Sequence, residues 1–279
     1  FMINFNGTIA SEDNLLTNNR GLLYGDSVFE TVKILDGKIL FAEDHYFRLM
    51  ASMRIVRMEI PMNFTMEYFE DQILSLAKAE NLEKSSRARV TIFRKEGGFY
   101  LPTDKNISFL ISVSALENTV YSIEKDFYEV ELYKDFIVTK HLLSTIKSSN
   151  RMINVTGSIF ADENGYDNCL LINDDKNVVE ALNGNLFMLM GNKLITPPIS
   201  EGCLNGVMRK QVLALARKIE SLEVVEEPIS PVDLQKADEL FVTNVIKGIQ
   251  PVTKYRKKEY ETKVSKDLLL RLNAQIRFN

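Results

Sequence analysis

The chain has few of the residues that build disulfide frameworks and histidine-based metal centres. Its 279 residues include two cysteines and two histidines. Cys169 and Cys203 lie in separate segments without CxxC spacing, so we expect two reduced, packed thiols. His45 and His141 are too few for a histidine-based metal site, and no acidic cluster has the spacing of a calcium loop. We therefore expect no metal.

A long hydrophobic run is also missing. No stretch approaches the ~20 apolar residues that a membrane helix needs, and MINFNGTIA near the start alternates like a strand, unlike the apolar core of a signal peptide. We expect no membrane association and, by default, a cytoplasmic location. The 34 basic and 38 acidic residues leave a net charge of −4, without the broad basic field that holds nucleic acid. Nucleic acid is therefore not an expected partner.

Length and composition favour two domains. With 279 residues and 45% hydrophobic content, the chain can bury two cores, given a usual domain size of about 100 to 150 residues. The polar stretch 116–126 lacks strong periodicity and is the expected linker. We therefore expect a small N-terminal α+β domain over 1–115 and a larger, β-rich C-terminal domain over 127–279.

Local patterns outline both domains. The first is expected to contain a strand over 2–9, a hairpin turning at Asp36 and Gly37, helices over 43–58 and 66–79 (the latter capped by Thr65), and the strands RARVTIFRK and ISFLISVSA. The second is expected to contain the strands YEVELY, DFIVT, CLLIND and VVEAL, the hairpin FMLMGNKLITP, a helix starting at Asn205 and a shorter helix after Ser230. The first domain is thus mixed, and the second is mostly strands.

Three separated motifs carry the chemistry. Lys147 lies in STIKSSNRM, Glu180 lies in VVEALNGNLF, and GCLNGVMR precedes a helix. Burial can lower the pKa of a lysine amine until it attacks an aldehyde, and a carboxylate can keep a pyridine nitrogen protonated. A turn at a helix N-terminus binds phosphate through backbone amides. An amine, a carboxylate and an anion-binding turn together suggest pyridoxal phosphate.

In this order and spacing, with NNRGLLYGDSVFETV and HYFRL upstream and LFVTNVIKGIQPV downstream, the chain resembles the class IV aminotransferases from about Phe5 to Val252. These are the fold type IV pyridoxal phosphate enzymes. The resemblance implies a two-domain α+β fold like that of D-amino acid aminotransferase, with the cofactor at the domain interface. It also implies a homodimer.

The resemblance assigns the cofactor residues. Lys147 takes the place of the Schiff-base lysine, and Glu180 that of the glutamate facing the pyridine nitrogen, with Asn185 supporting the site. Arg48 of HYFRL would bind the phosphate by a charge-assisted bond. The remaining phosphate contacts would come from the backbone amides of Val207, Met208, Val245 and Ile246. Both phosphate-binding turns depart from the family pattern. Met208 replaces a threonine found in many relatives, and the turn after FVTN also lacks a hydroxyl.

Substrate residues follow less directly. Phe29 and Glu30 match the family segment that approaches the substrate, and Thr31 is a candidate for an assisting hydroxyl. Arg87 and Arg89 share one face of RARVTIFRK and Arg94 takes the other, so Arg89 or Arg94 could bind a carboxylate or simply carry surface charge. Lys247 occupies a turn that faces substrate in relatives, and its charge suggests an anionic substrate.

The reaction stays open between several outcomes. Branched-chain aminotransferases usually have KxxGNY, whereas this chain has KSSNRM with Met152 in place of the tyrosine. The motif KxxNRM, the short length and the RxRxTxFRxxGG strand look more like the 4-amino-4-deoxychorismate lyases, which release pyruvate and leave 4-aminobenzoate for folate synthesis. A branched-chain or related aminotransferase acting on an amino acid is the second hypothesis, and D-amino acid aminotransferases also share KSxN. A noncatalytic relative that binds a phosphorylated ligand is the third.

Overall fold

The structure is a computed structural model that describes residues 2–11 and 18–278. The chain divides into two compact units. Unit 1 comprises Phe1–Thr119 with Ile146–Asn150, and unit 2 comprises Val120–Thr145 with Arg151–Asn279. The division between residues 119 and 120 lies inside the segment expected as a linker. The return of residues 146–150 to unit 1 differs from the expected boundaries, because this segment pairs with a strand of unit 1.

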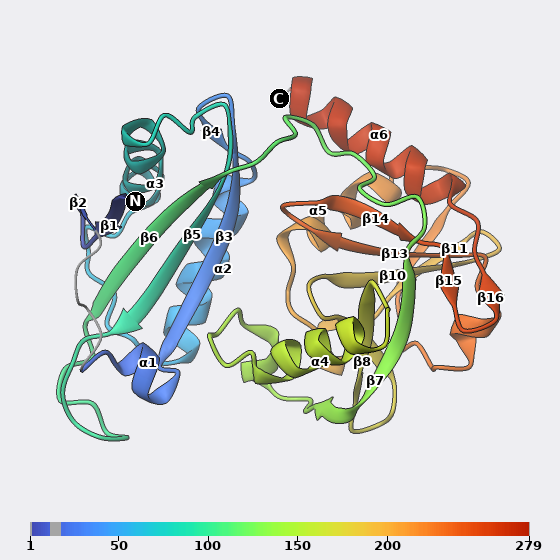
Figure 1. The fold of residues 1–279 in the computed structure, drawn as a ribbon, viewed down its shortest axis with the longest axis horizontal. Coiled ribbons are helices and arrows are strands. Elements are labelled where there is room, and N and C mark those ends of the chain that lie inside the picture. Colours follow the sequence, from blue (N-terminus) through green and yellow to red (C-terminus); the bar gives the residue numbers. More distant parts are fainter. Residues whose placement is uncertain (1, 12–17, 279) are drawn as a thin grey trace. The chain divides into compact units, whose positions relative to one another are not determined.

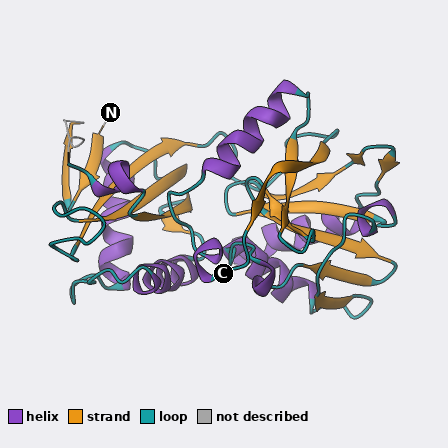
Figure 2. Ribbon diagram, turned by 90° about the horizontal axis from the view of Figure 1, so that it is seen from below, coloured by secondary structure: helices purple, strands orange, loops and turns teal. Residues whose placement is uncertain are grey.

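Unit 1 is a six-stranded antiparallel sheet in the order β2-β1-β6-β5-β3-β4 (Figure 1). Its elements are β1 (Met2–Phe5), β2 (Thr8–Ser11), α1 (Arg20–Tyr24), β3 (Ser27–Leu35), β4 (Lys38–Ile39), α2 (Ala42–Ile55), α3 (Met66–Ala79), β5 (Ser85–Arg94) and β6 (Ile107–Ala115). Alternate residues of β3, β5 and β6 pack with α2 and α3 to form its core, so both helices cover one face of the sheet (Figure 2).

Two local predictions in unit 1 are confirmed. Helix α3 begins after Thr65, whose hydroxyl oxygen accepts a hydrogen bond from the Tyr68 amide at 3.2 Å. The turn between β3 and β4 holds Asp36 and Gly37 at φ values of 48° and 73°, a region that Gly and Asp tolerate. In both places the signal lies within a short stretch of the chain.

Helix α2 ends at Ile55 and not near Met58 as expected. Arg57 adopts a left-handed φ of 59°, which a continuing α-helix does not allow. The carbonyls of Val56 and Arg57 accept hydrogen bonds from Arg94 at 2.7 and 2.9 Å. A side chain distant in sequence therefore fixes the end of this helix.

Unit 2 contains two five-stranded sheets in the orders β12-β11-β10-β13-β14 and β16-β15-β7-β8-β9, which share one apolar core. Its strands are β7 (Glu129–Val138), β8 (Asn168–Asn173), β9 (Val178–Ala181), β10 (Asn185–Met190), β11 (Lys193–Thr196), β12 (Glu223–Glu226), β13 (Glu239–Asn244), β14 (Gly248–Val252), β15 (Lys254–Tyr255) and β16 (Lys258–Glu259). Its helices are α4 (Met152–Glu163), α5 (Val207–Ala216) and α6 (Lys263–Phe278), with 3-10 turns η1 (Leu142–Thr145), η2 (Ile199–Glu201) and η3 (Asp233–Gln235). The α+β class predicted from the sequence is confirmed.

Several expected elements of unit 2 have different bounds. The predicted strands YEVELY and DFIVT form the single strand β7, whose pairing with β8 shifts register between Tyr133 and Val138. Helix α5 starts at Val207, because Gly206 before it is extended. The short helix after Ser230 is only the 3-10 turn η3. Helices α4 and α6 were not predicted.

No helix in the described ranges is long and apolar enough to cross a membrane.

Candidate active site

The segment that contains Lys147 runs along strand β3 of unit 1. The Phe29 amide donates a hydrogen bond to the Lys147 carbonyl at 2.8 Å, and the Ser149 amide donates to the Ser27 carbonyl at 3.0 Å. The motifs GDSVFET and KSSN, far apart in the sequence, therefore lie side by side in unit 1. Their backbone pairing fixes where the lysine side chain starts.

Phe29 brings two cationic groups together. The Arg89 Cζ atom lies 3.7 Å and the Lys147 Nζ atom 4.7 Å from the centroid of its ring. These two distances limit the separation of the two cationic groups to 8.4 Å. Thr31 lies directly opposite Arg89 in the β3–β5 ladder and so shares its face of the sheet. Four residues singled out from the sequence thus lie on one side of unit 1.

Glu30 and Arg48 form a bidentate pair on the other face of β3. Arg48 donates from Nε to Glu30 Oε1 at 2.7 Å and from Nη2 to Oε2 at 2.6 Å. The motif predicts that Phe29 and Glu30 both approach the substrate. Successive strand residues point to opposite faces, however, so Glu30 lies on the opposite face of β3 from Phe29. It points to helix α2 instead. The pairing of Arg48 with a carboxylate was not predicted.

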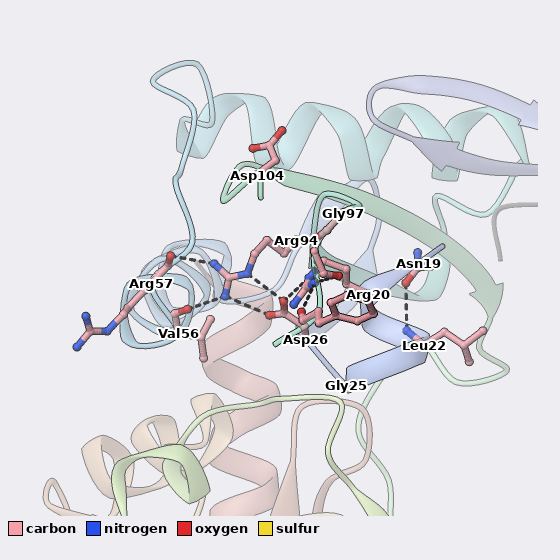
Figure 3. Close-up of polar contacts among 12 residues, drawn as sticks. Asn19, Arg20, Leu22, Gly25, Asp26, Val56, Arg57, Arg94, Gly97 and Asp104 are labelled. Carbon is pink, nitrogen blue, oxygen red and sulfur yellow. Dashed lines mark hydrogen bonds and ion pairs between the residues drawn. The ribbon is translucent and has the colours of Figure 1, made fainter. Parts of the chain in front are cut away.

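Arg94 has a structural role inside unit 1. Its guanidinium donates to both Asp26 oxygens at 2.9 and 3.1 Å and to the carbonyls of Val56 and Arg57 (Figure 3). Asp26 also accepts from Arg20 Nε at 2.9 Å. Through these bonds the guanidinium links the end of β5 to the end of α2. We therefore do not retain Arg94 as a substrate residue.

In unit 2, Glu180 and Asn185 hold the turn before α5. The Leu204 amide donates to Glu180 Oε2 at 2.9 Å, and Asn185 Nδ2 donates to the Leu204 carbonyl at 2.8 Å. Both side chains are buried. A Cβ atom at Gly206 would collide with Asn185 Oδ1, so only glycine fits this close approach. The carboxylate of Glu180 is thus fixed beside the GCLNGV turn.

The first turn of α5 offers backbone donors to an anion. Val207 and Met208 are its first two residues, and Gly206 at the N-cap provides no side-chain cap. Amides in a first helical turn have no acceptor within the helix, and the helix dipole is positive there. The arrangement can hold a phosphate group through its backbone amides.

The second expected phosphate turn is partly occupied by its own side chains. Asn244 Oδ1 accepts from the amides of Ile246 and Lys247 at 3.0 and 2.9 Å, and the Lys247 ammonium pairs with Glu124. The Tyr121 hydroxyl donates to the Val245 carbonyl at 2.6 Å. We therefore do not retain Ile246 as a phosphate donor, whereas Lys247, whose ion pair is exposed, stays a proposed substrate residue. Asparagine after a strand is a sequence signal for this kind of turn.

The family follows from comparison with known proteins. The family model described as amino-transferase class IV matches residues 27–255. The chain belongs to the class IV aminotransferases. A Methanocaldococcus jannaschii protein, provisionally named a branched-chain-amino-acid aminotransferase, is 31% identical over 252 residues, which cover 90% of this chain and 86% of that protein.

Solved structures share the fold. A branched-chain amino acid aminotransferase from Escherichia coli superposes with a TM-score of 0.86 at 21% identity, covering 97% of this chain and 92% of the other. A 4-amino-4-deoxychorismate lyase from Pseudomonas aeruginosa superposes with a TM-score of 0.84 at 22% identity, covering 98% and 99%. The expected fold type IV architecture is therefore confirmed.

Class IV aminotransferases depend on pyridoxal phosphate, so this chain is a pyridoxal phosphate enzyme. The residues described above suit this cofactor. Unit 1 presents an amine, and unit 2 presents a buried carboxylate and a helix N-terminus with a glycine at its cap. In the part of the chain that the structure describes, no group of His, Cys, Asp or Glu side chains is arranged to hold a metal ion.

Proposed function

We propose that this class IV aminotransferase converts 4-amino-4-deoxychorismate to 4-aminobenzoate and pyruvate. The observation that carries the proposal is the placement of Arg89 and Lys147 on the same aromatic ring, Phe29. A guanidinium binds a carboxylate well, and a lysine amine can move a proton. This substrate carries its reacting amine on a ring that also bears a carboxylate.

The cofactor contacts are proposed residue by residue. Glu180 would pair with the protonated pyridine nitrogen, while Arg48 and the amides of Val207, Met208 and Val245 would hold the phosphate. Asn185 would keep the turn before α5 in place through Leu204. When bound, the cofactor withdraws electrons from the carbon that bears the substrate amine.

Lys147 has two proposed tasks. Its amine would hold the cofactor and, once the substrate amine has replaced it there, the released lysine amine would take the proton from the ring carbon that bears the substrate amine. Loss of that proton drives cleavage of the bond between the ring and the enolpyruvyl oxygen. Lys147 returns a proton to the terminal carbon of the departing group, which leaves as pyruvate. Thr31 lies on the same face as Arg89, where its hydroxyl can hydrogen-bond the substrate.

A branched-chain or related aminotransferase is the second candidate. The Methanocaldococcus jannaschii relative favours it, because its 31% identity extends over 90% of this chain. The absence of the tyrosine of the KxxGNY pattern opposes it. Met152 stands at that place, as the first residue of α4.

The test compares both reactions on the purified holoenzyme. It is incubated with aminodeoxychorismate and, separately, with leucine and 2-oxoglutarate, and the release of pyruvate and glutamate is measured. Equimolar pyruvate and 4-aminobenzoate support the lyase. If leucine yields glutamate and aminodeoxychorismate yields no pyruvate, the lyase assignment is wrong and the chain is an aminotransferase.

Arg89→Gln tests carboxylate recognition in the same assay. We expect KM to rise by about tenfold to a hundredfold with a small change in kcat, because a charge-assisted bond is lost in the ground and transition states alike. Arg87→Gln is the matched control, since Arg87 lies on the same face of β5 but opposite Lys33 and farther along the strand. An equal rise in KM for both variants would contradict the assignment of Arg89.

A homodimer is also proposed, with an apolar patch of unit 1 at its interface. The patch consists of Leu22, Leu23, Tyr24, Phe99, Tyr100 and Leu101. Phe99 and Tyr100 are 82% and 91% exposed. Arg20 Nη1 holds the loop beside α1 by donating to the carbonyls of Gly97, Gly98 and Phe99 at 3.0, 3.2 and 2.7 Å. A contiguous exposed patch of this kind is typical of a protein interface.

Sedimentation analysis tests the dimer. Replacing Phe99 and Tyr100 together by serine should shift a wild-type dimer toward monomer. Met62→Ser removes another apolar side chain of unit 1 that is 99% exposed, and it should leave the dimer intact. A wild-type monomer, or a double variant that stays dimeric, would contradict the proposal.

A further inference from the structure

A buried polar cluster connects β3 to α2 in unit 1. Glu30 and His45 are 1% and 0% exposed. His45 Nδ1 lies 2.7 Å from Glu30 Oε2, the oxygen that also accepts from Arg48 Nη2. Arg48 lies at the margin of the cluster, with 11% of its side chain exposed. Two enclosed groups thus support a third that reaches the surface.

The charges within the cluster follow from its burial. Burial alone would raise the pKa of Glu30, but the charge of Arg48 and hydrogen bonds from His45 and Arg48 outweigh it and lower the pKa to about 2. Burial lowers the pKa of His45, helped by the charges of Arg48 and Lys147 and opposed by Glu30. Glu30 is therefore ionised and His45 neutral at pH 7. An ionised carboxylate only accepts hydrogen bonds, so the His45 proton is on Nδ1.

This arrangement fixes the orientation of the Arg48 guanidinium. Glu30 binds its Nε and Nη2 edge with both oxygens, and His45 holds the carboxylate from the other side. A planar group bound along one edge by two parallel hydrogen bonds cannot rotate about its long axis. The plane of the guanidinium is thereby set before any ligand arrives.

We propose that Glu30 and His45 are positioning residues that hold Arg48 in the orientation in which it binds the cofactor phosphate. The inference rests on the role of Arg48 given under the proposed function. The negative charge of Glu30 repels a phosphate. Glu30 therefore favours phosphate binding only if the gain from orienting the Arg48 guanidinium exceeds this repulsion. His45 contributes by fixing the carboxylate without adding charge.

The experiment measures the dissociation constants of pyridoxal phosphate and of pyridoxal for the full-length chain by absorbance titration. Pyridoxal lacks the phosphate, so it isolates what Arg48 recognises. Glu30→Gln keeps the size of the side chain but loses its charge and one acceptor. It should weaken pyridoxal phosphate binding by about tenfold to a hundredfold, the same size of loss as follows when a partner that orients a metal ligand is removed. Pyridoxal binding should not change.

Two substitutions of His45 form a matched pair. The amide nitrogen of His45→Asn can take the place of Nδ1 and donate to Glu30, whereas the amide of His45→Gln reaches the place of Nε2. We expect His45→Asn to retain most of the affinity for pyridoxal phosphate and His45→Gln to lose about tenfold. Comparing variants of one residue keeps the inference testable if Glu30→Gln does not fold. Urea midpoints of the two variants show whether their stabilities match.

Arg48→Lys separates this inference from the proposed function. If it weakens binding of pyridoxal phosphate but not of pyridoxal, Arg48 binds the phosphate. Wild-type affinity of Glu30→Gln and His45→Gln would then overturn the positioning role alone. Equal weakening of both ligands by Glu30→Gln, or tighter binding of pyridoxal phosphate, would also overturn it. If Arg48→Lys affects neither ligand, the assignment of Arg48 under the proposed function fails as well.

Discussion

Replacing Asp26 by asparagine should destabilise the chain more than any neutralisation of a surface carboxylate. Asp26 accepts three hydrogen bonds from two buried arginines, one from Arg20 and two from Arg94. The side chains of Arg20 and Arg94 are 3% and 8% exposed. Asparagine has almost the same shape but no charge. The substitution therefore removes the carboxylate charge that the two buried guanidinium groups share.

The magnitude follows from what each arginine keeps. Arg94 retains its bonds to two carbonyls, and Arg20 retains its bonds to the loop at residues 97–99. Breaking a buried ion pair costs about 3–5 kcal/mol, and the retained bonds favour the lower part of that range. A loss of about 3–4 kcal/mol corresponds to a fall in Tm of about 6–16 °C for a chain of this size.

Urea and thermal unfolding at pH 7 measure this loss. Burial would raise the pKa of Asp26, but its bonds to Arg94 and Arg20 outweigh burial and lower the pKa, so its contribution is fully present at neutral pH and declines only in acid. Asp71→Asn on the exposed side of α3 is the control, with an expected change of about 0.5 kcal/mol or less. A loss below about 1 kcal/mol for Asp26→Asn would refute the reasoning, because the arginines would then not depend on the carboxylate.

Further predictions concern other buried groups. Burial lowers the pKa of His45 below its ordinary value of 6.5, so the unfolded chain binds this proton before the folded chain does as the pH falls. Stability should therefore fall by up to about 1.4 kcal/mol for each pH unit between 6.5 and the lowered pKa, and His45→Asn should flatten this part of a curve of urea midpoint against pH. Glu239→Ala should cost about 2–4 kcal/mol in urea unfolding, because the buried Glu239 carboxylate caps α6 through the Val264 and Ser265 amides and the Ser265 hydroxyl. Burial raises the pKa of Cys203 to about 12, and we expect this thiol to resist a disulfide reagent at pH 8 until the chain is unfolded.

Sequence signals were sufficient where the deciding contacts are local. The cap of α3 lies three residues from its partner amide, and the β3–β4 turn needs only two residues that accept a positive φ. Helix α6, which is not among the predicted elements, also has a usable signal, because its buried Leu268, Leu269 and Leu272 are spaced for one helical face. Helix α4 had a weaker one, since Ile153, Val155 and Thr156 are β-branched residues that favour strands.

Contacts between distant segments were beyond sequence reasoning. The pattern of RARVTIFRK correctly divides its arginines between two faces, yet it cannot show that Asp26 and two carbonyls enclose Arg94. The pairing of residues 146–150 with β3 is another contact of this kind. Each of the two motifs can be recognised in the sequence, but the sequence does not show that they lie side by side. The motifs thus identify candidate residues, and only the fold shows which of these residues form hydrogen bonds or ion pairs with one another.

In the proposed cofactor site, the missing hydroxyls make Arg48 more important for holding the phosphate than the family pattern alone suggests. Met208 cannot donate a side-chain hydrogen bond where many relatives have threonine, and the Ile246 amide already donates to Asn244. Neutral backbone bonds are about half as strong as bonds from a charged donor, so a guanidinium supplies a larger share of the binding energy when hydroxyls are absent. An arginine that carries this share loses more when its orientation is free. The bidentate pairing with Glu30 meets that requirement without adding a donor.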